Sequence, residues 1–363
     1  RIDVLRPVQE ILKRVREKRD QALFALTKRF DGANLVTLRV SKNEIAAAYR
    51  KESADVIQAL KKARNAIRKF QRSTLIRERK VETTKGVRVW REFRPIERVG
   101  LYVPGGKAIY PSTVLMLGIP ARIAGCKEII LCVPPDKEGN IPSAVLVAAD
   151  LCGITKIFKV GGAQAIAAMA YGTETIPKVS KIFGPGNQYV TTAKMLVYGE
   201  VDIDMPAGPS EILVFADTTA RADWVAADLL SQLEHSEDAQ AIFITTSREL
   251  AEKVRAEVRQ QSIRLPRREI VRQSLKNSYI LITKTLEDTL TLINEYAPEH
   301  LEIISRDEAR ITPRIINAGS VFLGPYSGER GGEIICAAPA KEFIQDKRAL
   351  PARYLRGEEQ IQP

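Results

Sequence analysis

Apolar residues recur at helical spacing through the first part of the chain. One stripe of apolar residues between charged ones is typical of an amphipathic helix, and its members are Val8, Ile11, Leu12 and Val15. Ser41 followed by Glu44 forms a capping box that begins another helix. The pattern predicts helices at about residues 8–30, 41–50 and 54–72.

From residue 82 onward the chain alternates between short apolar runs and helical stretches. An extended segment at residues 82–104 comes first. Further strands are expected at residues 129–133, 157–160, 182–183, 212–215, 241–245 and 279–282. Helices are expected at residues 112–125, 144–151, 163–171, 223–233 and 248–259. Such alternation implies parallel sheets with crossover helices, so the sequence predicts an α/β fold of two units behind a helical N-terminal segment.

The formal net charge of +12 raises the question of nucleic-acid binding. Residues 1–100 contain 27 Lys and Arg against 12 Asp and Glu, whereas the remainder contains 29 against 32. The basic residues alternate with acidic ones in helical segments, which favours a solvated face over a nucleic-acid surface. No apolar run is long enough to span a membrane, and no secretory signal is visible near Arg1. We therefore expect a cytoplasmic protein with neither nucleic acid nor membrane as partner.

The cysteines show no Cys-x-x-Cys spacing, and three of the four lie in apolar stretches. This usage argues against a disulfide scaffold. Reduced and mostly buried thiols are expected at Cys126, Cys132, Cys152 and Cys336.

The chain contains only two histidines, and both lie among polar residues. Gln232 and His235 are three residues apart at the end of a helical stretch and could present an amide oxygen and an imidazole together. A histidine beside a helix C-terminus is the simpler alternative. His300 follows Glu299 at the start of an apolar run. A Glu-His pair suits acid/base chemistry, although neighbouring side chains on a strand point in opposite directions.

Glycine-rich turns follow three of the strand-like runs, at residues 104–106, 161–162 and 184–187. Each turn alone is typical of an ordinary loop. Together they favour a nucleotide-like ligand, because glycine allows close approach and open α/β sheets bind ligands beyond the carboxyl ends of their strands. A fourth such segment, residues 206–211, lies between the two predicted units, where a cleft is expected.

Seven segments, taken in order, resemble motifs of the histidinol dehydrogenases, the NAD- and zinc-dependent enzymes that complete histidine biosynthesis. They are residues 100–106, 111–120, 161–172, 184–187 with 189–191, 206–211, 228–235 and 295–301. The resemblance implies a homodimer of chains with two related, incomplete Rossmann-like domains. The implied boundaries are residues 1–100 with 208–335 for one domain, residues 101–207 for the other, and residues 336–363 for a divergent tail.

The resemblance also implies a reaction and roles for individual residues. L-Histidinol is oxidised to the aldehyde and then to L-histidine, with two NAD⁺ used in turn. Glu299 and His300 match the acid/base pair, in which His300 takes the alcohol proton and Glu299 activates the attacking water. The positions that match NAD contacts are Tyr102, Gln164 and Asn187.

A metal and substrate site is implied in the same way. Gln232 and His235 match two of the Zn²⁺ ligands, and zinc in this family holds the imidazole and amino groups of the substrate. Ser210 matches a substrate contact, and His300 also meets the substrate.

The sequence departs from the family pattern after Ser327. The family continues through Gly-Asp-Tyr and Gly-Pro-Asn/Ser-His, which supply an aspartate and a histidine to zinc, whereas here no histidine follows His300. Glu333 is the nearest substitute for the aspartate. One hypothesis is a frameshift, because codons for residues 331–339 can encode Gly-Asp-Tyr-Leu-Arg-Gly-Pro in another frame. The other is a lineage that lost the tail and with it the chemistry.

Two alternative functions stay open for this reason. The chain could be a catalytically impaired relative with an incomplete zinc site, since zinc normally takes at least three protein ligands. It could also be a related dehydrogenase for another alcohol.

Overall fold

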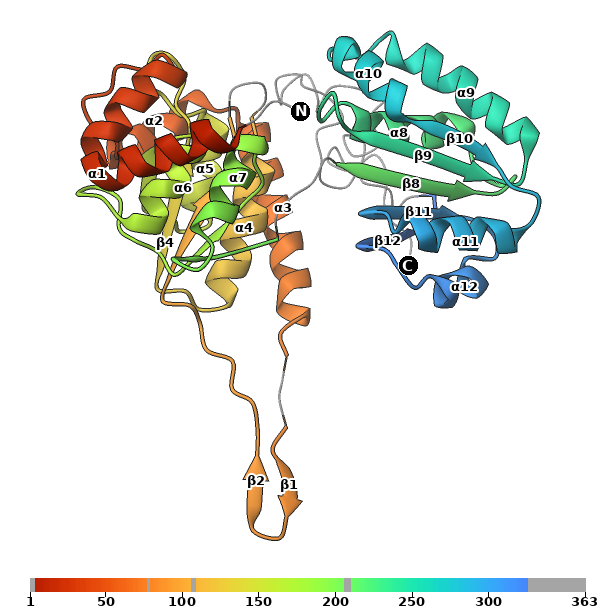
Figure 1. Ribbon diagram of the computed structural model, residues 1–363, viewed down its shortest axis with the longest axis horizontal. Coiled ribbons are helices and arrows are strands. Elements are labelled where there is room, and N and C mark those ends of the chain that lie inside the picture. The colour runs from red at the N-terminus through yellow and green to blue at the C-terminus, as the bar shows by residue number, and fades with distance from the viewer. Residues whose placement is uncertain (1–3, 77–78, 106–108, 206–209, 326–363) are drawn as a thin grey trace. The chain divides into compact units, whose positions relative to one another are not determined.

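The computed structural model describes residues 4–76, 79–105, 109–205 and 210–325 (Figure 1). The chain divides into two compact units, Arg1–Ala207 and Gly208–Pro363. Each unit contains a five-stranded sheet whose strands are all parallel, with helices on both faces. The predicted α/β class is therefore confirmed.

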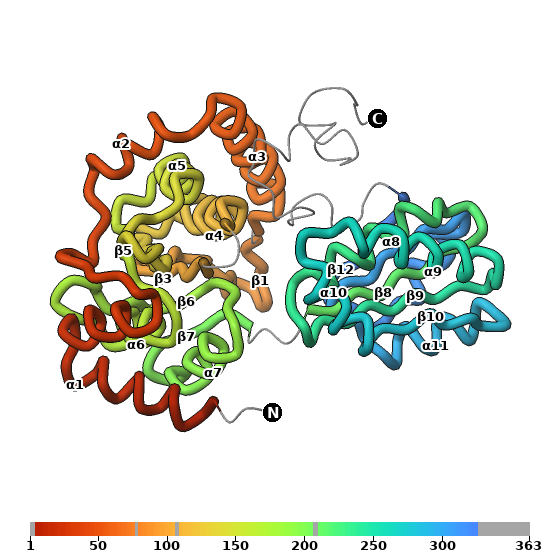
Figure 2. The backbone as a smooth tube through the Cα atoms, turned by 90° about the horizontal axis from the view of Figure 1, so that it is seen from above, coloured from red at the N-terminus to blue at the C-terminus, as the bar shows by residue number. Residues whose placement is uncertain are grey.

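The first unit is built on a sheet with the strand order β5-β4-β3-β6-β7. Its strands are β3 (Arg98–Tyr102), β4 (Glu128–Val133), β5 (Lys156–Lys159), β6 (Lys181–Phe183) and β7 (Asp202–Ile203). On one side lie three helices that pack on one another, namely α1 (Leu5–Phe30), α6 (Gly162–Tyr171) and α7 (Gln188–Val197) (Figure 2). On the other side lie α4 (Pro111–Ile123) and α5 (Ser143–Leu151), with α2 (Lys42–Lys51) and α3 (Ala54–Ser73) packed on them.

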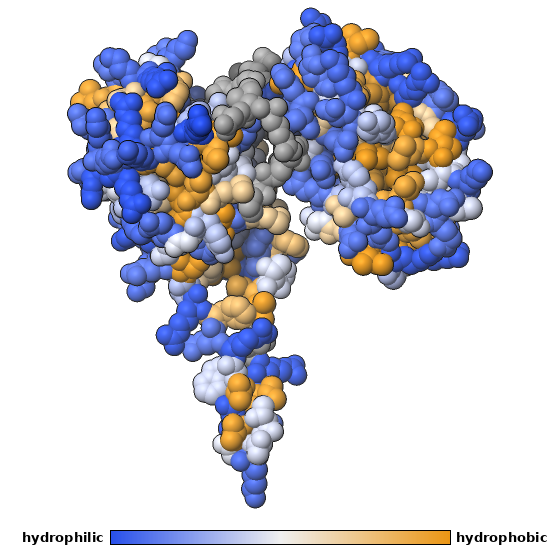
Figure 3. Space-filling view, viewed as in Figure 1, coloured by the Kyte–Doolittle hydropathy of each residue, from blue (hydrophilic) through white to orange (hydrophobic). Residues whose placement is uncertain are grey.

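A hairpin separates α3 from β3. Its strands, β1 (Val81–Thr84) and β2 (Val87–Val89), pair with each other in antiparallel orientation, and their residues are exposed. Apolar side chains gather on this hairpin in the space-filling view (Figure 3). The single extended segment expected at residues 82–104 is thus divided into a hairpin and a strand of the sheet.

The second unit repeats the topology of the first, with the strand order β10-β9-β8-β11-β12. Its strands are β8 (Glu211–Ala216), β9 (Gln240–Thr245), β10 (Tyr279–Ile282), β11 (His300–Ile304) and β12 (Ser320–Leu323). One face is covered by α8 (Ala222–Leu233), α9 (Arg248–Ser262) and α10 (Arg268–Ser274), and the other by α11 (Leu286–Tyr296) with α12 (Glu308–Ile311) beyond it (Figure 1). Short 3₁₀ turns lie at Leu275–Asn277 and Thr312–Arg314. In both sheets the first strand lies at the centre, the next two on one side and the last two on the other.

The division of the chain differs from the predicted domain boundaries. Residues 1–100 are predicted to group with residues 208–335. Instead α1 packs on α6, and α3 packs on α4 and α5, so the described part of residues 1–100 belongs to the first unit. The predicted tail at residues 336–363 lies outside the described residues.

Several local predictions are confirmed. Ser41 caps α2: its hydroxyl oxygen accepts the Glu44 N–H at 3.2 Å, while the Glu44 carboxylate accepts the Ser41 N–H at 2.8 Å. Cys126, Cys132 and Cys152 are buried free thiols, and Cys336 lies outside the described residues. Within the described ranges, no helix combines the length and the apolar character needed to cross a membrane.

Candidate active site

The strand order of the first sheet reverses beside β3. The chain passes from β3 to β4 and β5 on one side and then returns to β6 on the other. Open α/β sheets bind ligands outside the carboxyl ends of the strands at such a reversal. Tyr102 is the last residue of β3, and residues 184–187 follow β6, so two of the predicted cofactor positions lie at this edge.

Tyr102 and Gln164 meet at Gly162. The Tyr102 hydroxyl oxygen accepts the Gly162 N–H at 3.1 Å. The φ of Gly162 is +62°, which favours glycine, and an added Cβ would lie 2.8 Å from the amide oxygen of the flexible Gln164 side chain. Burial raises the pKa of Tyr102 to about 12. The phenol therefore stays protonated near neutral pH and keeps its O–H as a donor.

The loop at residues 184–187 lies against the end of β3. A Cβ at Gly184 would lie 2.0 Å from the Tyr102 carbonyl oxygen, and the φ of Gly184 is +129°. Asn187 ends the loop as the cap of α7, because its Oδ1 accepts the N–H groups of Tyr189 and Val190 at 3.1 and 3.2 Å. Its amide nitrogen is then the donor left to meet a ligand.

The electrostatics of this edge favour an anion. Helices α6 and α7 both begin here, directly after β5 and β6. Helix N-termini carry partial positive charge and present backbone N–H groups, which suits phosphate. The Gly162 N–H already donates to Tyr102. The Tyr189 and Val190 N–H groups donate to Asn187, so these helix N-termini favour an anion through their partial positive charge.

The candidate residues of the second unit lie at the opposite edge of their sheet, where the strands begin. Ser210 directly precedes β8, and His300 is the first residue of β11, the neighbour of β8. Gln232 and His235 lie at the end of α8, before β9, the other neighbour of β8. The Ser210 carbonyl accepts the N–H of Gln240, the first residue of β9, at 3.1 Å.

Glu299 and His300 are both bonded to the backbone of Glu211. His300 Nδ1 lies 3.1 Å from the Glu211 carbonyl oxygen, and the Glu211 N–H donates to Glu299 Oε2 at 3.3 Å. Glu299 Oε2 and His300 Nδ1 are 3.8 Å apart. Because a carbonyl can only accept, this contact places a hydrogen on Nδ1, and in the neutral imidazole the lone pair is then on Nε2. Sequence analysis did not single out Glu211, although it lies in the fourth glycine-rich segment.

His235 has the same arrangement. Its Nδ1 lies 3.1 Å from the Ser231 carbonyl and 3.2 Å from the Gln232 carbonyl, at the end of α8. A hydrogen is therefore on Nδ1, and in the neutral imidazole the lone pair is on Nε2. Gln232 is buried in the last turn of α8, whereas His235 lies just beyond the helix. The two residues therefore do not share one face of a helix, because only Gln232 lies within α8.

The electrostatics of this second edge favour a cation. The C-termini of α8 and α11 both lead into it, and helix C-termini carry partial negative charge. Glu234, which sequence analysis did not single out, is 3% exposed. Burial raises the pKa of Glu234 to about 7, against the effect of Arg267 and His235.

The donors for a metal are incomplete within the described residues. No group of three or more His, Cys, Asp or Glu side chains there could hold a metal ion. Gln232 and His235 are the two predicted ligands that the structure describes. The third, Glu333, lies outside the described residues.

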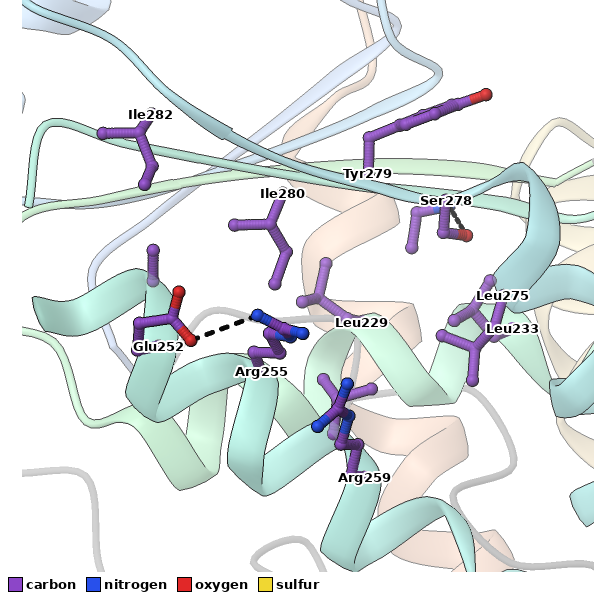
Figure 4. Close-up of a pocket in the computed structure, with 13 residues that line it drawn as sticks. Leu229, Leu233, Glu252, Arg255, Arg259, Leu275, Ser278, Tyr279, Ile280 and Ile282 are labelled. Atoms are coloured by element: carbon purple, nitrogen blue, oxygen red, sulfur yellow. Dashed lines mark hydrogen bonds and ion pairs between the residues drawn. The ribbon is translucent and has the colours of Figure 1, made fainter. Parts of the chain in front are cut away.

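A separate cavity of about 510 Å³ lies in the second unit between α8, α9 and β10 (Figure 4). Its lining is mostly apolar and includes Leu229, Leu233 and Ile280, while Arg255 donates to Glu252 at 3.3 Å on α9. None of the predicted site residues lines this cavity, so it is not the candidate active site.

Comparison with known proteins identifies the family. The sequence model for histidinol dehydrogenase matches residues 1–339. The chain is 51% identical over 327 residues to a histidinol dehydrogenase of Halalkalibacterium halodurans, covering 90% of this chain and 77% of that protein. It is 52% identical to the histidinol dehydrogenase of Bacteroides thetaiotaomicron, covering 90% of this chain and 76% of that protein. The crystal structure of the Elizabethkingia anophelis histidinol dehydrogenase matches with a TM-score of 0.89 at 49% identity, over 92% of this chain and 77% of that one.

The chain belongs to the histidinol dehydrogenase family. The resemblance found in the seven segments is thereby confirmed. Membership assigns the chain to an oxidoreductase family of histidine biosynthesis.

Proposed function

We propose that this chain oxidises L-histidinol to L-histidine through the aldehyde, with two NAD⁺ used per turnover. The observation that carries the proposal is the bonding of Glu299 and His300 to the backbone of Glu211 in a chain of this family. This bonding holds an imidazole and a carboxylate side by side at the start of β11 in the second unit.

His300 is the proposed base of the first oxidation. Its Nδ1–H donates to the Glu211 carbonyl, so Nε2 can accept the proton of the substrate hydroxyl while hydride leaves the carbon that bears this hydroxyl. Glu299 is the proposed base of the second oxidation. Its carboxylate, held by the Glu211 N–H, takes a proton from the water that adds to the aldehyde.

The first unit supports a dinucleotide site. Gly162 begins α6 after β5, and Gly184 directly follows β6, so both glycines lie at the carboxyl ends of strands, where open α/β sheets bind ligands. When bound, NAD⁺ would supply the hydride acceptor for each oxidation. Tyr102, Gln164 and Asn187 are the proposed contacts.

The second unit supports part of a zinc site. His235 donates its Nδ1–H to backbone carbonyls. Metal-binding histidines are usually oriented by such a hydrogen bond from the other ring nitrogen. Gln232 and His235 would hold Zn²⁺, with Glu333 as the proposed third ligand. Zinc there would bind the imidazole and amine of histidinol, for which Ser210 and His300 are further proposed contacts. We also propose that the chain acts as a cytoplasmic homodimer.

A second candidate is an impaired relative, or a dehydrogenase for another alcohol. Residues 331–339 favour it, because they contain Glu333 only as the nearest substitute for the family's aspartate, and no histidine follows His300 in the sequence. Turnover of histidinol by the unaltered chain decides between the two candidates.

The assigned roles are tested by separating the two oxidations. Glu299→Gln is expected to release the aldehyde after one NADH per histidinol, because the water step loses its base. His300→Ala is expected to lower kcat for histidinol by roughly 10²–10⁴-fold. Glu295→Gln, an exposed carboxylate four residues earlier, is the control and keeps the parental rate. Parental kcat in His300→Ala would remove the assigned base.

A further inference from the structure

Lys194 is a buried lysine on α7. Its residue is 3% exposed, and its Nζ donates to the Gly184 carbonyl at 3.0 Å and forms an ion pair with Asp204. A lysine ammonium is rarely buried unless it is paired. The sequence alone does not reveal this burial, because Lys194 is an ordinary position within a helical segment.

Asp204 completes a closed set of contacts. It follows β7, and its Oδ2 accepts the Gly184 N–H at 2.7 Å. Both backbone polar groups of Gly184 are therefore bonded to the Lys194–Asp204 pair. The pair joins the loop after β6 to the helix that follows it and to the segment after β7.

This arrangement fixes the loop that carries Asn187. Gly184 lies so close to the end of β3 that an added Cβ would be 2.0 Å from the Tyr102 carbonyl oxygen. Because Asn187 follows three residues later, a small shift of Gly184 would change the spacing between Asn187 and Tyr102. We infer that Lys194 and Asp204 are positioning residues, which hold residues 184–187 in the shape that binds a dinucleotide. The inference rests on the proposed NAD site.

A purely structural ion pair is the competing explanation, and the same two strands offer a control. Lys181 and Asp202 face each other across β6 and β7, where their charged atoms are 2.8 Å apart. This pair has the same residue types but is more exposed, with side-chain exposures of 25% and 53% against 4% and 27% for Lys194 and Asp204. Among the described contacts, neither of its side chains bonds to residues 184–187. Loss of either pair removes one ion pair from the same region of the sheet.

The test uses the full chain and two readouts. The dissociation constant for NAD⁺ is measured by calorimetry, and amide hydrogen exchange of residues 184–187 is measured without NAD⁺. Lys194→Met and Asp204→Ala are expected to weaken NAD⁺ binding by about tenfold, the scale of one lost charged hydrogen bond, and to speed exchange of the loop. Asp204→Asn keeps an acceptor for Gly184 and is expected to show a smaller loss. Lys181→Met and Asp202→Ala are expected to match the parent in both readouts.

Two results would overturn the inference. The first is loop exchange in Asp204→Ala equal to that of Asp202→Ala, and the second is faster exchange with unchanged affinity for NAD⁺. If Lys194→Met does not fold, the two Asp204 variants decide. An unaltered chain that fails to bind NAD⁺ would overturn the proposed function itself, and this failure is distinguishable because it appears before any substitution.

Discussion

At the scale of single residues, Asp31 shows how burial sets protonation. It ends α1, and its Oδ2 is buried without a hydrogen bond from any described residue. Burial raises the pKa of Asp31 from 3.8 to about 6, because the charged carboxylate loses hydration. The proton thus binds more tightly in the folded state. The resulting stability is complete below about pH 4 and is lost as the pH rises through 6.

Asp31→Asn is therefore expected to stabilise the protein at neutral pH. The amide has similar shape and no charge to bury, so the free energy of unfolding at pH 7 should rise by about 2 kcal/mol over the parent. Near pH 4 the two proteins should be equal. Urea unfolding at both pH values checks this, with exposed Glu17→Gln on the same helix as the control. A variant less stable than the parent at pH 7 would contradict the assigned cause.

His235 carries the second prediction at this scale. His235→Ala removes the imidazole proposed to bind zinc, so we expect less zinc per chain after equilibration with the metal and removal of excess. His300→Ala is the matched control, because it removes the other imidazole and leaves Gln232 and His235 intact. Metal analysis of the three proteins gives the result. Equal zinc in His235→Ala and the parent would refute the assignment.

At the scale of elements, α1 shows where local pattern stops being sufficient. The apolar stripe predicted one helix over residues 8–30, and the structure has it, but with a break at Arg19, whose φ is 44° and ψ −127°. The Asp20 N–H donates to Glu174 at 3.0 Å, and the Thr175 hydroxyl donates to the Asp20 carboxylate. These contacts join residues more than 150 positions apart, which local periodicity does not report.

The loop after β6 gives a prediction at this scale. Gly184→Ala places a methyl group against the Tyr102 carbonyl and forces a positive φ, whereas Gly199→Ala forces a φ of +102° in open space. Gly199→Ala is expected to cost about 1 kcal/mol of unfolding free energy. Gly184→Ala is expected to cost about 2 kcal/mol more, from the steric clash. The free energy of unfolding of both variants is measured by chemical denaturation. An equal decrease in Gly184→Ala and Gly199→Ala would show that the loop can move away from β3.

At the scale of the whole chain, one topology appears twice with different chemistry at its edges. In the first unit the candidate residues lie where strands end and helices begin, which suits an anion. In the second unit they lie where strands begin and helices end, which suits a cation. NAD⁺ with its phosphates, and a metal with an amine substrate, correspond to these two preferences.

Sequence reasoning predicted the alternation of elements because periodicity, capping residues and glycine turns act locally. The assignment of Tyr102, Gln164 and Asn187 to NAD came from the resemblance to the family and stays a prediction. Sequence reasoning did not find Glu211, Lys194 or Asp204. Glu211 meets His300 across 89 positions, and the Lys194–Asp204 pair acts through the backbone of Gly184, so neither produces a pattern along the chain.

The amount of NADH formed per histidinol tests the proposed function most directly. The measurement uses the purified, folded chain with zinc, excess NAD⁺ and a limiting amount of L-histidinol. Because the alcohol and the aldehyde are each oxidised once, two NADH and one histidine are expected per histidinol. A folded preparation that binds NAD⁺ but forms no NADH from histidinol would contradict the proposed function.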